Sequence, residues 1–467
     1  MISVLNHQLQ SSGNKLSVFF LLFVFCMVSC GGTKEVVRTS SRTKSTTKTR
    51  TNKRNRGAVK VDTVKWKNAE RLKRSSNSKK VEEVSKSDAA PELKDRYNVT
   101  IFLPLDTKSA TGSDLTDMGT RATRYLNYYA GVKLGLDKLE QEGVSLNVNI
   151  EEADKGNISS RLRDRSARNA DVIIGPQKTS DLLTTAAYGN KNEITVVSPW
   201  KTTSDIEDND SYLQLLPSLF DHYYKMTENA SRNFDADQIY LIGRKGNNKD
   251  IKRFKYFQKY NREINGANAD PLLEFLVEED SLLNGETAYD EIFHMDKTTV
   301  VIFPNYRSSD EKFLYNGLRR LNVEKGMRHV IAYTMPLAMD SDIITFEQYR
   351  NLNMRVVRSH YVDPTDIRVK DFKRQYFYTY NALPTEEAFE GYDMIRFVGK
   401  SLQKYGSDFQ FYVSKDDDGY LQTAFDIEKV PSKKRLARGS EIEPISYFKN
   451  VHLEILEFKN NKFYRTK

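Results

Sequence analysis

Cysteine is nearly absent from this sequence: among its 467 residues only Cys26 and Cys30 occur. Cys26 lies inside an apolar stretch near the N-terminus, so a chain cleaved after that stretch would keep one thiol and could form no internal disulfide. A zinc site built from thiolates and a cysteine nucleophile in the folded part are excluded for the same reason. A chain of this length can instead be stabilised by a buried core.

Long apolar runs are also scarce, and the clearest one spans residues 16–28. It follows Lys15 and leads through Ser29 to Cys30, the arrangement of a signal peptide over residues 1–29. The run is too short for a membrane-spanning helix, which needs about 20 apolar residues. Its end, Ser-Cys-Gly, resembles a bacterial lipobox, which implies a lipid on Cys30. An ordinary secretory signal and an N-terminal buried hairpin are the alternatives.

The next segment, residues 31–60, carries charge of almost one sign. It contains ten Lys or Arg residues and a single acidic residue, Glu35, so its net charge of +9 equals that of the whole chain. The remainder is therefore close to neutral, and we expect no nucleic-acid partner. With so few large apolar side chains, residues 30–95 are predicted to form a disordered tether. It would act as a solvated spacer or adhere to anionic lipid or peptidoglycan.

Tryptophan occurs only twice, and Trp66 lies within the tether in the segment VDTVKWKNAERL. A tryptophan in a polar linker is a candidate for docking on an envelope protein partner, although it could equally pack on the chain's own folded domain.

From Tyr97 onward, short apolar runs alternate with amphipathic segments, the pattern of βα units on a parallel sheet. In the predicted helix over residues 121–143, apolar residues recur at steps of three and four and form one face. These residues are Tyr125, Tyr129, Val132, Leu136 and Leu139. The same strand and helix pattern repeats from residue 238. The sequence thus predicts an α/β protein with two doubly wound, Rossmann-like halves.

Four segments in order resemble the landmarks of type I periplasmic binding proteins: YYAGVKLGLDKLEQEGVSLNVNIEEAD, VIIGPQKTSDLL, TVVSPWKTTSDI and FKRQYFYTYNALPTEEAFEGYDMIRFVGKSL. The leucine/isoleucine/valine-binding group and its receptor-like relatives are the most similar branch. The resemblance covers residues 97–467 and implies two lobes with parallel sheets joined by three crossovers. The first lobe would take about residues 97–216 and 338–410. The second would take about residues 217–335 and part of the C-terminal tail.

In this fold the ligand cleft lies at the carboxyl ends of the strands, where helix N-termini favour anions. Hydroxyl groups there would contact a ligand carboxylate, although capping of the helix explains Thr179 and Ser180 equally well. The segment AYTMPLA lacks the acidic residue that amino-acid binders offer to an ammonium group, so an anionic ligand, or none, is expected. The candidate binding residues are Thr179, Ser180, Ser198, Trp200, Lys201, Thr202 and Tyr306. The bulk of Trp200 and Lys201 would reduce the cleft.

No GxSxG, GxxxxGK or HExxH motif occurs, so we expect no enzyme, no catalytic residue, no metal and no cofactor.

Two functions remain. One is an envelope lipoprotein that binds or senses a small polar ligand between its lobes. The other is a scaffold or activator of envelope machinery, similar to the lipoprotein activators of peptidoglycan synthases. Because no aspartate follows Cys30 at the second position, the anchor is expected in the outer membrane, facing the periplasm.

Overall fold

The computed structural model describes residues 91–105, 120–153, 157–284, 287–417, 419–433 and 444–466. Cys30 and Trp66, with the predicted signal peptide and nearly all of the tether, lie outside these residues. Within the described residues, none of the helices is both long and apolar enough to cross a membrane.

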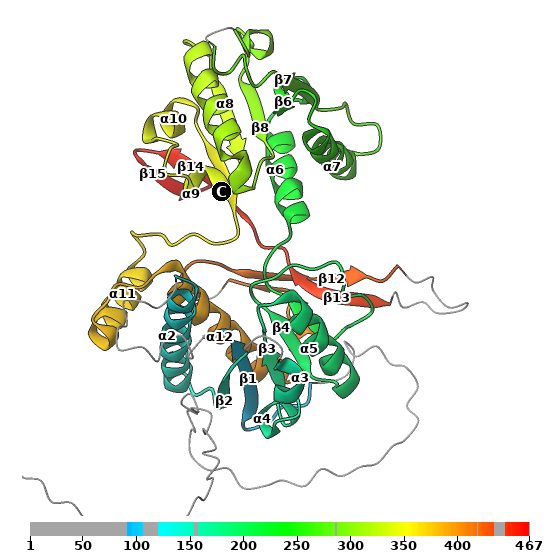
Figure 1. Cartoon of the computed structure of the whole chain (residues 1–467), viewed down its shortest axis with the longest axis vertical. Helices are drawn as coiled ribbons and strands as arrows, with labels where there is room; N and C mark the ends of the chain where they lie inside the picture. Colours follow the sequence, from blue (N-terminus) through cyan, green and yellow to red (C-terminus); the bar gives the residue numbers. More distant parts are fainter. Residues whose placement is uncertain are drawn as a thin grey trace, which may run out of the picture. The chain divides into compact units, whose positions relative to one another are not determined.

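The first lobe is built on an eight-stranded sheet with the order β11-β12-β13-β5-β4-β3-β1-β2 (Figure 1). Its elements are β1 Tyr97–Leu103, α2 Thr120–Gln141, β2 Leu146–Glu152, α3 Ile158–Arg161, α4 Arg165–Arg168, β3 Val172–Ile174, α5 Thr179–Asn192, β4 Thr195–Ser198, β5 Tyr212–Gln214, α11 Ile367–Tyr380, α12 Glu386–Tyr405, β11 Lys415–Asp416, β12 Phe425–Pro431 and β13 Ile445–Asn450. The strands from β2 to β5 pair in parallel, β13 joins β5 in parallel, and β12 and β11 add antiparallel strands at the edge.

The second lobe is built on a seven-stranded sheet with the order β15-β14-β10-β9-β8-β6-β7. Its elements are α6 Leu219–Asn233, β6 Ile239–Arg244, α7 Asn248–Asn265, β7 Leu273–Val277, β8 Thr299–Phe303, α8 Glu311–Glu324, β9 Val330–Thr334, α9 Leu337–Asp340, α10 Phe346–Asn351, β10 Arg355–Arg358, β14 Glu454–Lys459 and β15 Lys462–Arg465. Strands β6 to β10 pair in parallel, and β14 and β15 are antiparallel. The predicted α/β class with two parallel sheets is confirmed.

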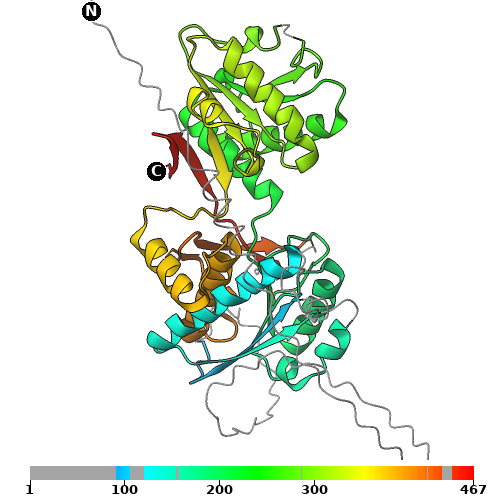
Figure 2. The same cartoon turned by 60° about the vertical axis from the view of Figure 1, so that its left-hand side comes forward.

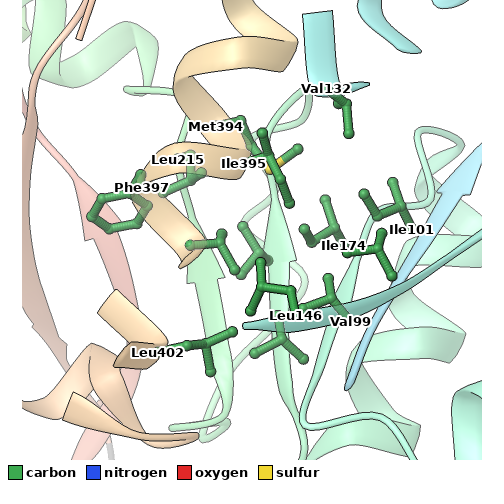
Figure 3. Close-up of a cluster of buried hydrophobic side chains, with 14 of the residues drawn as sticks. Val99, Ile101, Val132, Leu146, Ile174, Leu215, Met394, Ile395, Phe397 and Leu402 are labelled. Atoms are coloured by element: carbon green, nitrogen blue, oxygen red, sulfur yellow. The ribbon is translucent and has the colours of Figure 1, made fainter. Parts of the chain in front are cut away.

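Both faces of the first sheet are buried because helices cover both. On one face α2 and α12 lie side by side (Figures 1 and 2) and enclose apolar side chains of the sheet. Figure 3 shows this core, in which Val99 and Ile101 of β1 meet Val132 of α2 and Ile395 of α12. On the other face, α3, α4 and α5 pack over a second cluster that includes Phe102. The apolar face predicted for residues 121–143 is confirmed, because its members belong to or pack against this core.

The chain passes between the two sheets three times, after β5, after β10 and after β13. The first passage ends in a capping box: Asp221 accepts a hydrogen bond from the Ser218 N–H at 2.7 Å, and the Ser218 hydroxyl accepts one from the Asp221 N–H. The Asn450 amide donates to the Leu215 carbonyl at 3.1 Å, which joins the first passage to the end of β13.

The lobe boundaries differ from those expected from the sequence. The chain returns to the first lobe only after Arg358, later than residue 338, because β10 pairs with β9 in the second sheet. The returning segment then extends to Asn450, beyond residue 410, because β12 and β13 complete the first sheet. The places of β10, β12 and β13 have weak local signals in the sequence, because what specifies them is pairing with other strands of the sheets.

Candidate functional site

A cavity of about 630 Å³ opens at the carboxyl edge of the first sheet. Its walls come from the segments that follow β3, β4, β5 and β10, from α2 and α12, and from residues 422–425 and Asn450. Ligand pockets usually have volumes of about 300–1,000 Å³, so this cavity has room for a small molecule. Its place matches the rule that ligands of open α/β sheets bind outside the carboxyl ends of the strands.

One wall of the cavity is aromatic and centres on Trp200. The Trp200 ring meets the rings of Tyr125 and Tyr128 edge-on, with centroids 5.7 and 5.0 Å apart. Behind it lies Gly175, with φ +79°, where an added Cβ would come within 2.9 Å of the indole and 2.8 Å of the Phe102 carbonyl oxygen. A glycine is therefore needed here to let the indole lie against the end of β3.

Helices α2 and α12 approach each other closely where they line the cavity. A Cβ added to Gly131 would lie 1.9 Å from the Ala388 carbonyl oxygen, and one added to Gly391 would lie 2.2 Å from that of Tyr128. Only residues without side chains allow the two backbones to pack at this distance. The contact brings Tyr128 of α2 and Glu390 of α12 to the same cavity.

The first turns of α12 supply carboxyl groups to the cavity. Arg124 donates a hydrogen bond to Glu387 at 2.6 Å, and this bond helps to hold the pKa of Glu387 below its ordinary value although burial would raise it. His360, whose Nε2 lies 3.7 Å from Glu386, lowers the pKa of that carboxyl. Glu390 has no such partner: burial, together with the charge of Glu387, raises its pKa to about 8.

A fourth carboxyl group, Asp393, organises the opposite wall. It is buried and accepts hydrogen bonds from the backbone N–H groups of Leu421 and Gln422 at 2.8 and 2.9 Å. Burial raises the pKa of Asp393 to about 7, and these bonds oppose that shift. The fixed turn brings Gln422 to the cavity, where its buried side-chain oxygen has no hydrogen-bond partner.

The carboxyl edge of the second sheet has a different character, because its charges pair with one another. Arg244, at the end of β6, donates to Asp250 and Asp310 at 2.8 Å each, and Arg253 donates to the same two carboxyl groups at 2.7 and 3.1 Å. The two arginines lower the pKa of Asp310 although burial would raise it. The ring of Tyr306 lies over Arg253, 5.2 Å from its guanidinium. This four-charge cluster is complete without a ligand.

Within the described residues, no group of three or more His, Cys, Asp or Glu side chains is arranged to hold a metal ion.

Solved structures similar to this chain belong to transport and regulatory proteins. A protein of Rhodospirillum rubrum described as a branched-chain amino acid ABC transporter is 13% identical, with a TM-score of 0.53 over 79% of this chain and 99% of its own. LpoA from Haemophilus influenzae is 7% identical, with a TM-score of 0.52 over 81% of this chain and 60% of its own. The LpoA C-domain, described as a regulator of PBP1A, is 9% identical, with a TM-score of 0.49 over 79% of this chain and 99% of its own.

The two-sheet topology agrees with the Rhodospirillum rubrum protein and with full-length LpoA, whose TM-scores exceed 0.5. The chain has the type I periplasmic-binding-protein fold. At these identities the likeness concerns the fold alone. No family model matches the chain, and no curated protein matches it in sequence. The resemblance predicted from the four sequence landmarks is confirmed at the level of the fold.

Within this fold the predicted binding residues do not form one site. Trp200 lines the 630 Å³ cavity, whereas Thr179 and Lys201 line a separate cavity of about 250 Å³ beside α5. Ser180 is exposed, and its hydroxyl donates to Asp181 at 3.1 Å. The remaining three lie elsewhere: Ser198 is buried and donates to the Lys201 carbonyl at 3.0 Å, Thr202 is exposed, and Tyr306 packs beside the four-charge cluster.

Several cavity residues escaped the sequence analysis, among them Arg124, Tyr128, Glu390 and Gln422. The sequence does carry a signal for α12, because Glu386, Glu390 and Asp393 recur at steps of four and three within the fourth landmark, which places them on one helical face. In the sequence alone this segment indicates the fold but not a binding site. No local signal marks Gln422, which reaches the cavity through the contacts of Asp393.

Proposed function

We propose that the chain is an envelope protein whose first lobe binds or senses a small polar ligand. The ligand-sized cavity at the carboxyl edge of the first sheet carries this proposal, because it lies where this fold binds ligands and Trp200 leaves it open. The structural neighbour described as a branched-chain amino acid ABC transporter supports a solute-binding role. The protein acts without catalysis and uses no cofactor.

The proposal extends to the location of the protein. Cys30 carries the lipid, the basic tether separates the folded part from the membrane, and the anchor lies in the outer membrane facing the periplasm. LpoA among the neighbours supports an envelope location. In the periplasm the tether is free to contact peptidoglycan or anionic lipid.

A ligand screen by thermal unfolding tests the binding role. We expect amino acids, nucleobases, sugars or cell-wall fragments to include a compound that raises the melting temperature, since a ligand at 100 times its Kd stabilises by about 2.7 kcal/mol. Trp200→Leu should abolish the shift because it removes the central ring of the aromatic wall. Tyr378→Leu, on the exposed surface of α11, serves as the control and should leave it unchanged. A screen without any shift contradicts the proposal.

A second candidate function is the scaffold or activator of an envelope synthase. Two observations favour it. The chain is similar to LpoA, whose C-domain is described as a regulator of PBP1A. In the second lobe, the members of the four-charge cluster pair with one another and offer no free charge to a ligand. Trp66 would then dock the tether on the partner.

Deletion of residues 61–72 tests this candidate. We expect the deletion to abolish co-purification of an envelope partner from membranes, because it removes Trp66 and the apolar residues around it. A deletion of equal length within the polar residues 73–84 controls for the shorter tether. Equal recovery of the partner with both deletions would count against docking through Trp66.

A further inference from the structure

Three acceptor groups at the cavity have no protein partner. Tyr128 is only 1% exposed, and its buried hydroxyl makes no hydrogen bond. Gln422 is only 3% exposed, and its buried side-chain oxygen also has no hydrogen-bond partner. No hydrogen bond or ion pair within the described part of the chain engages the Glu390 carboxyl. Buried polar groups without partners are costly, which applies to Tyr128 and Gln422, and Glu390 is half-buried beside them. The Gln422 oxygen can only accept a hydrogen bond and the other two groups can also accept one, so their gathering around one cavity indicates a missing donor.

The charge of the walls defines the kind of donor. Among the described residues, four carboxyl groups line the cavity, from Glu386, Glu387, Glu390 and Asp393, and Arg124 is the only arginine or lysine in the lining. The Arg124 guanidinium is already bound by Glu387. Glu386 is paired with Arg358 and His360, at 3.4 and 3.7 Å, so within the described part of the chain the acidic groups of the walls without an ion-pair partner are Glu390 and Asp393. A carboxylate ligand would face these two groups, contrary to the anion expected from the sequence. A cation would be attracted to the unpaired Glu390.

The aromatic and apolar walls of the cavity could contact the charged head and the aliphatic stem of such a cation. The Trp200 face and the neighbouring tyrosines offer a π surface, which attracts an ammonium or guanidinium group. Leu215, Met394 and Phe425 line the cavity with apolar atoms that would cover an aliphatic stem. We propose that the cavity binds a cationic group, an ammonium or guanidinium on an aliphatic stem, through Glu390, Gln422 and the Trp200 wall. This inference rests on the proposed ligand-binding function and names the class of ligand.

Two sources can present this group. One is a free amine in the periplasm. The other is the chain itself, since residues 31–60 hold ten Lys or Arg residues and the roughly 30 residues that separate them from Pro91 span up to about 100 Å when extended. Occupation by the tether would make the basic segment a competitor of the free ligand.

The affinity for a cation should depend on pH. Glu390 faces Glu386, Glu387 and Arg124, together with Tyr128 from α2, and its pKa is about 8. Asp393 and His360 line the same cavity. Near pH 6 this carboxyl holds a proton, which a bound cation must displace. Affinity is therefore expected to rise between pH 6 and pH 8, while an alkylammonium, with a pKa above 10, stays charged.

The experiment uses three probes of equal length, 1,5-diaminopentane, 1,5-pentanediol and glutarate, titrated calorimetrically into the full mature chain at pH 6 and pH 8. We expect binding of the diamine alone, stronger at pH 8. Glu390→Gln should weaken it at least tenfold and reduce the pH dependence to the part set by Asp393, whose pKa is about 7. Glu347→Gln, an exposed residue of α10, is the matched control and should change nothing. Melting temperatures verify that both variants fold.

A chain whose ten basic residues in 31–60 are replaced by glutamine separates the sources. Tighter diamine binding by this chain identifies the tether as the competing occupant, and equal binding identifies a free amine; both support the cationic site. Binding of glutarate or pentanediol that depends on Trp200 would overturn the inference and leave the ligand-binding function standing. A diamine that binds with equal affinity to Glu390→Gln would also overturn it. If none of the probes and no compound of the thermal screen binds, both proposals fail.

Discussion

Gly131→Ala is expected to destabilise the protein although alanine is the better helix former. In an exposed helix, Gly→Ala stabilises by up to about 1 kcal/mol. At Gly131, however, the new Cβ would lie 1.9 Å from the Ala388 carbonyl oxygen, and backbone atoms cannot move aside as a flexible side chain can. Helices α2 and α12 would have to separate, so we expect a loss of about 3 kcal/mol, at the upper end of the cost of overpacking.

Chemical denaturation measures this loss. Glu140→Ala, at an exposed position of the same helix, provides the control and should have little effect. Because α2 carries Tyr128 and α12 carries Glu390, separation of the helices should also lower the affinity of the cavity for its ligand. An unfolding free energy equal to or above that of the parent would show that the helices tolerate a wider spacing.

Asp250→Asn is expected to destabilise the second lobe by about 3–5 kcal/mol. Asp250 is fully buried and accepts hydrogen bonds from Arg244 and Arg253. The neutral amide would leave the buried guanidinium of Arg253 and the largely buried one of Arg244 with Asp310 as the carboxylate partner that the cluster retains. Removing one member of a buried ion cluster is costly because the remaining charges stay desolvated.

Urea unfolding at pH 7 measures the effect, and Asp237→Asn is the control, since Asp237 pairs with Lys297 at an exposed site. The cluster also predicts that the free energy of unfolding depends on pH in the acid range. Because the pKa of Asp310 is lowered in the folded state, its contribution is present at neutral pH and is lost as the pH falls through that lowered value. Equal unfolding free energies of Asp250→Asn and Asp237→Asn would show that the cluster does not stabilise the lobe.

The fold was largely accessible from the sequence. Parallel strands buried on both faces leave nearly continuous apolar runs such as β8 and β9, and the helices between them leave a period near 3.6, so both halves could be predicted. Gly131 and Gly391 lie within the first and fourth landmarks, but only the structure shows their role in the close packing of α2 and α12. Less accessible were the limits of the lobes, because β10 and β13 are specified by their partners in the sheets.

The candidate site was much less accessible. Trp200 lies next to a strand end, which a sequence can locate, and it does line the cavity. Thr179 and Ser180 also follow a strand end, yet Thr179 lines a smaller cavity and Ser180 is exposed without lining either cavity. Their position at the start of α5 is equally explained by the local needs of a helix N-terminus. Strand ends mark the edge of a sheet where ligands bind, but not which side chains turn toward a cavity.

The sequence by itself determined the α/β class, the repeated lobe and the excess of positive charge near the N-terminus, because each depends on composition or on periodicity along the chain. Only the tertiary structure decided the charge of the cavity. Glu390 and Gln422 lie 32 residues apart in the sequence, and Tyr128 lies further still, so their gathering depends on the close contact of α2 with α12 and on the turn fixed by Asp393. The excess of carboxyl groups there arises from packing between distant segments, which no local pattern records.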